Sequence, residues 1–302
     1  MELEFRNIVK SYGKNEILHG LNFKVESGRP MGFLGRNGAG KTTTIRALMG
    51  VFKLNSGEIL LDGKKINNKK LRIGYLPEER GMYGKQQILE QLIYFGTLRG
   101  GTRVESKKSA SELLERVGLG EYAKKNLDTL SKGNQQKVQI VQSLLNNPDI
   151  LILDEPFSGL DPINSTMLKE MILESTGDNK LLLFSSHQMG YVEEICDDIT
   201  LIDSGDIVLS GNLSDIQREL GENKLRLSAV NMNREELTSY IGSQIDGIDI
   251  SHDKQSLIIT LNSMDKSELL SELLKLNVDI DLFSVYKPSM SDIFIKYAGD
   301  EK

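Results

Sequence analysis

Cysteine and long apolar runs are what this sequence has least of. Cys196 is the only cysteine among the 302 residues, so an intrachain disulfide and a cysteine-based metal cluster are both excluded. A single free thiol suits a reducing compartment. No apolar run approaches the roughly 18 residues of a membrane-spanning helix, and residues 1–6 lack the apolar centre of a signal peptide. We therefore expect a cytoplasmic protein that reaches a membrane only by docking on a membrane protein.

A surplus of positive charge is also missing. The formal net charge is −6, which argues against a nucleic-acid partner held by a broad basic surface. The acidity is uneven, because residues 221–302 hold 9 lysines and arginines against 14 aspartates and glutamates, whereas residues 1–220 are nearly balanced. Charged residues make up 26% of the chain, as in globular proteins, and the length allows two domains. The acidic tail is therefore a distinct unit.

What the sequence does contain is a glycine-rich loop, G-R-N-G-A-G-K-T, at residues 35–42. It fits the pattern G-x-x-x-x-G-K-[ST] between an apolar strand-like run, residues 31–34, and a helix-like segment. Glycines let successive backbone N–H groups point at one set of phosphate oxygens, and a helix N-terminus adds its positive end. Lys41 can reach the outer phosphates and the Thr42 hydroxyl can ligate Mg²⁺. The residues expected to bind a nucleoside triphosphate are Gly35, Arg36, Asn37, Gly38, Ala39, Gly40, Lys41, Thr42 and Thr43.

The apolar pattern of residues 1–220 indicates an α/β fold. Residues 150–153 and 181–184 are apolar at every position, which suits strands buried on both faces of a parallel sheet. Helix-like segments lie between such runs. Residues 82–146 differ, since they are rich in Gln, Leu, Glu, Lys and Ala with little strand character. We predict a P-loop ATPase core with a helical subdomain inserted at about 82–146.

The acidic tail has a pattern of its own. Strand-like and helix-like segments follow one another in the order β-α-β-β-α-β, with a last helix, and that order matches a ferredoxin-like split βαβ. The strands are expected at 225–227, 248–250, 257–259 and 278–285, and the helices at 235–241, 268–276 and 291–297. We predict a small α+β accessory domain over residues 221–302.

Two acids follow the buried run at residues 150–153. Asp154 and Glu155 stand at the C-terminal end of an expected parallel strand, which is where α/β sheets bind ligands. A P-loop needs a carboxylate for Mg²⁺ and a group that orients the attacking water. We assign Asp154 to the metal and Glu155 to the water.

Five ordered motifs resemble those of the nucleotide-binding subunits of ABC transporters. They are residues 35–43, the signature L-S-K-G-N at 130–134, residues 151–156, S-G-L-D-P at 158–162, and Ser186-His187. The resemblance covers residues 1 to about 220. It implies two copies, as a homodimer or a heterodimer with a paralogue, that close head to tail on two ATP molecules and hydrolyse them. It also implies a separate integral membrane permease, docked at the helical insertion and the loop at Glu78, on the cytoplasmic face of the membrane.

The resemblance also gives roles to single residues. Tyr12 matches the aromatic residue that stacks on adenine, and His187 matches the switch histidine that contacts the γ-phosphate. With Glu155 and Lys41, His187 would form the catalytic group. Asp161 matches the residue that links the two sites of the dimer. The signature residues that would cap the γ-phosphate bound to the opposing copy are Ser131, Gly133 and Asn134.

Three positions depart from the family pattern. Lys132 and Asn134 replace a glycine and a glutamine of the signature, and Glu78 replaces the glutamine that usually follows Tyr75-Leu76-Pro77. A carboxylate can still approach Mg²⁺, so Glu78 is included among the metal ligands. These variants, with residues 79–83, resemble a branch of bacterial export-type ATPases associated with drug, sodium or peptide efflux. Members of that branch often carry an extra C-terminal domain.

Other functions stay open at this point. One is a non-transport ABC ATPase acting on ribosomes or DNA, although such proteins usually carry two cassettes or a long coiled coil, and this chain has one motif set. Another is that residues 221–302 sense a ligand and gate the ATPase. His19, His252 and the lysine pairs 64–65 and 69–70 are expected to be plain surface residues. The transported substrate is chosen by the permease and lies outside this sequence.

Overall fold

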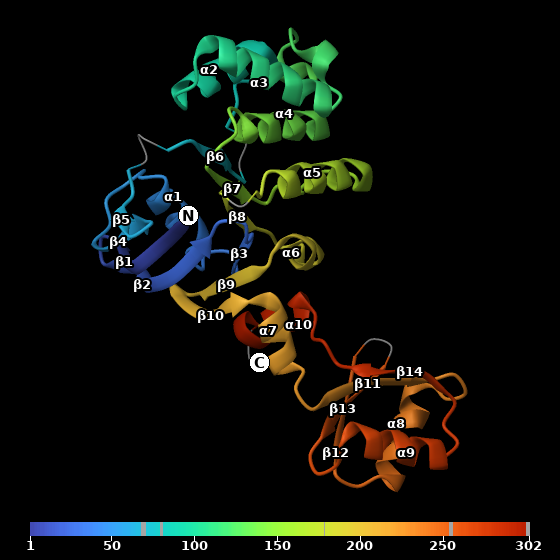
Figure 1. The fold of residues 1–302 in the computed structure, drawn as a ribbon. Coiled ribbons are helices and arrows are strands. Elements are labelled where there is room, and N and C mark those ends of the chain that lie inside the picture. Colours follow the sequence, from blue (N-terminus) through green and yellow to red (C-terminus); the bar gives the residue numbers. More distant parts are fainter. Residues whose placement is uncertain (68–70, 79–80, 178, 254–255, 300–302) are drawn as a thin grey trace. The chain divides into compact units, whose positions relative to one another are not determined.

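The computed structural model describes residues 1–67, 71–78, 81–177, 179–253 and 256–299 (Figure 1). Lys69, Lys70, Glu79 and Arg80, which entered the sequence argument, lie outside the described residues. The chain divides into two compact units, Met1–Leu213 with Ile293–Lys302, and Ser214–Asp292. The boundary between Leu213 and Ser214 falls a few residues before the domain boundary expected near residue 220.

Two sheets form the frame of the first unit. The six-stranded sheet has the order β10-β9-β3-β8-β7-β6, and its strands are parallel except for β10. Its bounds are β3 Met31–Leu34, β6 Ile73–Leu76, β7 Ile150–Asp154, β8 Leu181–Ser185, β9 Asp198–Asp203 and β10 Asp206–Asn212. Every residue of β3, β7 and β8 is buried. For β7 and β8 this confirms the prediction made from the uninterrupted apolar runs 150–153 and 181–184.

The second sheet of this unit is antiparallel. Its order is β2-β1-β4-β5, with β1 Glu2–Tyr12, β2 Asn15–Glu26, β4 Ser56–Leu61 and β5 Lys64–Lys65. Apolar–polar alternation predicts strands here only at residues 3–5 and 21–25, and β1 and β2 extend well beyond these segments. The register shifts after Phe5 and interrupts the period of two. Asn7, at φ 52°, lies within that irregular stretch.

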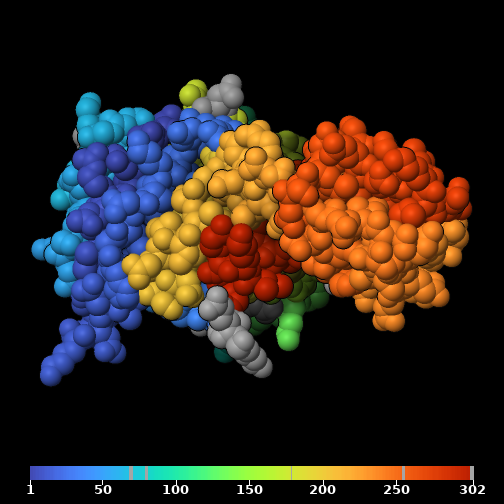
Figure 2. Space-filling view, turned by 90° about the horizontal axis from the view of Figure 1, so that it is seen from below, coloured from blue at the N-terminus to red at the C-terminus, as the bar shows by residue number. Residues whose placement is uncertain are grey.

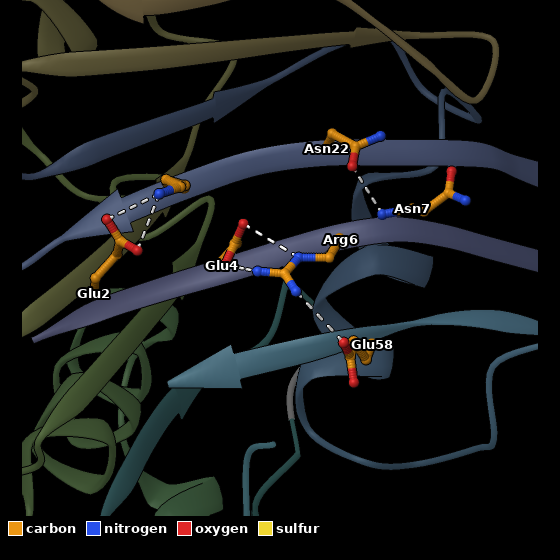
Figure 3. A network of polar contacts seen from close by, with 7 residues as sticks. Glu2, Glu4, Arg6, Asn7, Asn22 and Glu58 are labelled. Atoms are coloured by element: carbon orange, nitrogen blue, oxygen red, sulfur yellow. Dashed lines mark hydrogen bonds and ion pairs between the residues drawn. The ribbon is translucent and has the colours of Figure 1, made fainter. Parts of the chain in front are cut away.

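The exposed face of the antiparallel sheet carries charged pairs on neighbouring strands (Figure 3). Lys24 of β2 lies 3.1 Å from Glu2 of β1. Arg6 of β1 bonds to Glu4 at 2.8 Å and lies 3.7 Å from Glu58 of β4. Each exposed pair contributes little to stability, yet opposite charges on facing positions favour the observed register, in which Arg6 pairs with Glu58.

Helices connect the parallel strands and build the insertion. The connecting helices are α1 Lys41–Leu48, α5 Pro162–Glu174 and α6 Met189–Ile195, and the insertion holds α2 Ile88–Leu98, α3 Arg103–Arg116 and α4 Lys132–Leu144. Figure 1 shows α2, α3 and α4 gathered together beside β6. Local sequence sets their starts, since Thr102 and Glu105 form a capping box on α3 and Ser131 caps α4.

A turn between two strands supports the glycine-rich loop. The N–H of Gly205, between β9 and β10, donates to the carbonyl of Ala39 at 3.0 Å, and the N–H of His19 donates to Gly205 O at 3.0 Å. His19 Nδ1 also lies 2.9 Å from Asp206 Oδ2, and that hydrogen bond raises the pKa of His19. Figure 2 shows the blue N-terminal strands beside the yellow surface of β9 and β10. His19 is therefore a partly exposed residue with a partner, which its isolated position in the sequence did not indicate.

The second unit has the predicted ferredoxin-like order. It contains β11 Lys224–Ala229, α8 Arg234–Gln244, β12 Ile248–His252, β13 Leu257–Leu261, α9 Lys266–Lys275 and β14 Ile280–Val285. The antiparallel sheet runs β12-β13-β11-β14, and both helices begin with a capping box. Its core includes Leu225, Leu227, Leu237, Ile241, Leu257, Ile259, Leu269 and Leu273. Helices α7 Leu213–Leu220 and α10 Met290–Ala298 flank these elements in the chain. Within the described ranges, no helix has both the length and the apolar character needed to cross a membrane.

Candidate nucleotide-binding site

The glycine-rich loop joins β3 to α1 and depends on glycine at three positions. Gly38 and Gly40 have φ values of 84° and 114°, in the left-handed region that glycine adopts without strain. Gly40 is also the N-cap of α1. At Gly35 a Cβ atom would lie 2.3 Å from the carbonyl oxygen of Ile202, so β9 approaches the loop too closely for any side chain. These three requirements fix the loop in the form that exposes the N-terminus of α1.

A cavity of about 260 Å³ lies above this loop. It gathers loop residues together with side chains that follow the C-terminal ends of β6, β7 and β8. The residues that line it are Ile17, Arg36, Asn37, Gly38, Gly40, Lys41, Thr42, Thr43, Glu78, Asp154, Glu155 and His187. Ile17 is the one lining residue that the sequence argument did not select, and nothing distinguishes it from the other apolar residues of β2.

The two acids after β7 are held by the neighbouring strand β8. Asp154 and Ser185 are paired in the parallel ladder, and the Ser185 hydroxyl donates to Asp154 Oδ1. The N–H of Glu155 donates to Ser185 O at 3.0 Å, and Glu155 adopts φ 51°. That left-handed conformation is uncommon for a residue other than glycine and turns the chain sharply at the end of the strand. Ser185 is a site residue that the sequence argument missed, although its place after an apolar run was a signal.

Glu155 contacts two side chains that follow β8. Its Oε2 accepts a hydrogen bond from the Ser186 hydroxyl at 3.3 Å, and its Oε1 lies 3.5 Å from Nε2 of His187. Oε1 is buried and has no hydrogen-bond partner among the described residues. Burial raises the pKa of Glu155, and the charge of Asp154 adds to this, whereas His187 and Ser186 oppose it. A buried carboxylate with a raised pKa and an oxygen that accepts no hydrogen bond is suited to accept a proton from a bound water.

Lys41 is, with Arg36, a cationic side chain that lines the cavity. Its ammonium donates to the carbonyls of Gly35 at 2.5 Å and Arg36 at 3.1 Å, so the side chain lies back along the loop. Burial lowers the pKa of Lys41, and the charges of Asp154, Glu155 and Glu78 act in the opposite direction. The ammonium is thus within electrostatic range of all three carboxylates of the cavity.

Seven residues that the sequence argument placed in the site do not line this cavity, and two of them, Gly35 and Ala39, belong to the glycine-rich loop itself. Tyr12 ends β1, is 52% exposed, and packs edge-on against Phe52 with ring centroids 6.0 Å apart. Lys10 Nζ lies 4.9 Å from the centroid of the Tyr12 ring. The other four, Ser131, Gly133, Asn134 and Asp161, lie at helix starts.

These helix starts are ordered by their own side chains. Ser131 accepts a hydrogen bond from the N–H of Asn134 at 3.4 Å at the start of α4. Asp161 accepts from the N–H of Asn164 at 3.0 Å at the start of α5. Both contacts have a capping role within one copy of the chain. None of these four residues lines the cavity.

The cavity fits a magnesium ion bound together with phosphate. The described residues contain no group of three His, Cys, Asp or Glu side chains arranged to hold a metal ion by themselves. Mg²⁺ commonly takes one or two carboxylates and completes its octahedron with phosphate and water oxygens. The cavity offers the hydroxyl of Thr42 and the carboxylate of Asp154 beside the phosphate loop, which is the donor set this arrangement requires.

Known proteins share both parts of this chain. The family described as "ABC transporter" matches residues 18–158, and "ATP-binding protein DrrA1-3-like, C-terminal domain" matches residues 211–298. The uncharacterized ABC transporter ATP-binding protein YhaQ of Bacillus subtilis is 35% identical over 298 residues, 98% of each chain. The linearmycin resistance ATP-binding protein LnrL of the same organism is 32% identical over 98% of each chain.

A third relative and a solved structure agree with these matches. The bacitracin transport ATP-binding protein BcrA of Bacillus licheniformis is 30% identical over 97% of this chain and 96% of its own. A solved structure of an ATP-binding subunit of an ABC transporter superposes with a TM-score of 0.68 and 29% identity, over 73% of this chain and 94% of that one. With these matches and with the phosphate loop, two acids and a histidine in one cavity, the chain belongs to the ABC transporter ATP-binding proteins, a family of ATPases that drive transport.

Proposed function

We propose that two copies of this chain close head to tail on two ATP molecules and drive export through a separate membrane permease. The observation that carries this proposal is the single cavity in which Lys41 of the phosphate loop meets Asp154, Glu155 and His187. ATP-binding subunits of this family dimerise and pair with membrane permeases. In this arrangement the chain lies on the cytoplasmic face of the membrane.

Within one copy, we assign the hydrolytic roles as follows, and the geometry supports them. The loop N–H groups and the start of α1 bind the phosphates, and Lys41 turns its ammonium from the loop carbonyls to the outer phosphate oxygens. Glu155 orients the attacking water and accepts its proton at Oε1, which receives no hydrogen bond from the described residues. His187, 48% exposed at its side chain, is free to contact the γ-phosphate from the mouth of the cavity.

The proposed metal ligands of this chain are the Thr42 hydroxyl, Asp154 and Glu78. When bound, Mg²⁺ neutralises negative charge on the β- and γ-phosphate oxygens. The hydrogen bond from Ser185 fixes Oδ1 of Asp154, so that the carboxylate faces the cavity in one orientation.

The rest of the site comes from the opposing copy. Ser131, Gly133 and Asn134 lie at the N-terminus of α4, where the dipole and the free N–H groups attract an anion. None of them lines the cavity of its own copy, which is what a shared site requires. Asp161, at the start of α5, would link the two sites across the dimer, and Tyr12 would stack on the adenine.

The permease would dock on the helical insertion and the loop that follows Glu78. Large side chains exposed in this part of the chain are Tyr83, Tyr94 and Leu98. A hollow of about 610 Å³ is lined by Tyr83, Gly84, Lys85, Gln86, Glu90, Gln91 and Tyr94. Exposed apolar and aromatic groups of this extent are typical of protein interaction sites.

Efflux is the direction that the relatives support. Two of them are named for linearmycin resistance and for bacitracin transport, and both match this chain almost end to end. We extend to this chain only the general function of exporting a harmful compound, because the permease selects the substrate.

The test is purification of the chain from membranes of its source cells. We expect a multi-span membrane protein to co-purify in a stable ratio, and ATPase activity that depends on Lys41. ATPase activity that rises on addition of ribosomal RNA or DNA, with no membrane protein present, would contradict the transport function and favour the non-transport class of this family.

A further inference from the structure

The register of β6 and β7 places Glu78 next to Asp154 and Glu155, which are far from it in the sequence. β6 and β7 are adjacent parallel strands, and Leu76 pairs with Leu153 at their last common position (Figure 1). The chain leaving β6 therefore runs next to the chain leaving β7, and strands in a sheet lie about 4.8 Å apart. Glu78 follows two residues after the end of β6, as Glu155 follows two residues after Leu153. The three carboxylates of Glu78, Asp154 and Glu155 line one cavity.

The electrostatic environment of two neighbouring groups agrees with this placement. The charge of Glu78 acts on the Lys41 ammonium, together with those of Asp154 and Glu155. Burial first, and then the charges of Asp154 and Glu78, raise the pKa of the Tyr75 hydroxyl to about 12. Glu78 therefore adds its charge to the site itself, although its side chain is exposed.

This third carboxylate changes what the cavity attracts. The phosphate chain of ATP is strongly anionic, and a carboxylate that lines the same cavity repels it, most strongly at low ionic strength. Arg36 and Lys41 are the cationic side chains that line the cavity, against three carboxylates. A divalent cation would reverse this balance, because carboxylate and phosphate oxygens then share one positive centre.

We infer that Glu78 makes nucleotide binding in this cavity conditional on a divalent cation, by repelling the free nucleotide and attracting the metal-bound one. In thermodynamic terms, Glu78 increases the coupling free energy between the binding of the cation and the binding of the nucleotide. With glutamine at this position, the chain would bind free and metal-bound nucleotide with more similar affinities. This inference rests on the proposed binding of ATP in the cavity. It concerns the form of the nucleotide that binds, and the rate of hydrolysis does not enter.

The experiment measures binding of the non-hydrolysable analogue AMP-PNP to the full chain by calorimetry, at fixed ionic strength. The dissociation constant is determined in excess EDTA and in excess MgCl₂, for the unmodified chain, for Glu78→Gln and for Glu112→Gln. Glu112 is an exposed residue of α3 outside the cavity, so its variant controls for the loss of one negative charge.

We expect Glu78→Gln to bind AMP-PNP in EDTA about fivefold or more tightly than the unmodified chain, and to lower the EDTA-to-Mg²⁺ ratio of dissociation constants by a similar factor. Glu112→Gln should leave both values unchanged. A ratio unaltered by Glu78→Gln would overturn the inference, as would an equal loss of affinity in both buffers, which indicates a structural role. An equal effect of Glu112→Gln would also overturn it. If the unmodified chain binds AMP-PNP in neither buffer, it is the proposed function that fails.

Discussion

The carboxylate of Glu155 faces the imidazole of His187, with 3.5 Å between Oε1 and Nε2. The two residues follow neighbouring parallel strands, β7 and β8, whose register pairs Asp154 with Ser185. Glu155 is buried while His187 reaches toward solvent. The two residues proposed to accept the proton of the water and to contact the γ-phosphate are thus held at the same edge of the sheet.

Replacing Glu155 by glutamine should separate binding from hydrolysis. The amide side chain would keep the shape and a hydrogen bond with Ser186 but could not accept a proton, so we expect ATP affinity to be retained and turnover to fall by about 100-fold or more. Steady-state phosphate release and nucleotide binding measure the two effects. Glu121→Gln, at an exposed position of the insertion, is the matched control. Near-normal turnover in the Glu155→Gln variant would remove this residue from the catalytic role.

The same variant should change how stability depends on pH. Burial raises the pKa of Glu155 above its ordinary 4.5, so the folded chain retains this proton to higher pH than the unfolded chain. Between those two pKa values the unfolding free energy falls as pH rises, and above them the buried charge exerts its full cost. Glutamine bears no such charge. We expect the Tm of Glu155→Gln to equal that of the unmodified chain below pH 4.5 and to exceed it by a few degrees at about pH 7. A Tm difference that does not vary with pH would contradict this.

Gly35→Ala should destabilise the first unit. Its Cβ would lie 2.3 Å from the carbonyl oxygen of Ile202, so either the loop or β9 must move. We expect a loss of about 1–3 kcal/mol in urea unfolding, together with weaker nucleotide binding. Gly177→Ala is the control, since a Cβ there meets no atom within 4 Å. Equal stability of the two variants would show that β9 does not constrain the loop.

Tyr12 should matter for the base rather than for the phosphates. Its ring stands exposed at the end of β1, next to Phe52 and Lys10. Loss of a stacking partner costs about 1–3 kcal/mol in nucleic-acid complexes, so Tyr12→Ala should weaken ATP binding by about tenfold. Tyr12→Trp should keep the affinity, and Tyr94→Ala, an exposed tyrosine of α2, should not change it. Titration with a fluorescent ATP analogue measures all three, and unaltered binding by Tyr12→Ala would exclude stacking.

Gly133→Ala should test the shared site without harming the fold. Within one copy the added Cβ would meet only Gly159 O, at 3.9 Å, which is an ordinary contact. In a head-to-tail dimer the same atom would stand between the N-terminus of α4 and the opposing phosphate. In a Glu155→Gln background with ATP, we expect light scattering to show a dimer that Gly133→Ala abolishes, with Tm unchanged. Gly190→Ala is the control, because a Cβ there meets no atom within 4 Å. A dimer that persists in the Gly133→Ala variant would contradict the shared site.

Much of the fold was determined by local patterns in the sequence. The uninterrupted apolar runs of β7 and β8 indicated buried strands, and the glycine-rich loop indicated a connection from a strand to a helix. The ferredoxin-like order of the second unit followed from short alternating segments between capped helices. The true lengths of β1 and β2 did not follow, because a register shift breaks the alternation on which such an inference depends.

The sequence indicated which residues form the site, whereas only the tertiary structure decided how these residues are arranged. Spacing indicated that Asp154 and Glu155 lie at a strand end, but only the parallel register brings Ser185 and Ser186 against them. The raised pKa of Glu155 results from its burial among these segments. The same burial leaves its Oε1 without a hydrogen bond from the residues that the structure describes. The support of the loop by Gly205, and the place of Glu78 beside the acids of β7, likewise join segments far apart in the chain. Local periodicity indicates which face of a helix or strand is buried, whereas contacts between distant segments exist only once the sheet has formed.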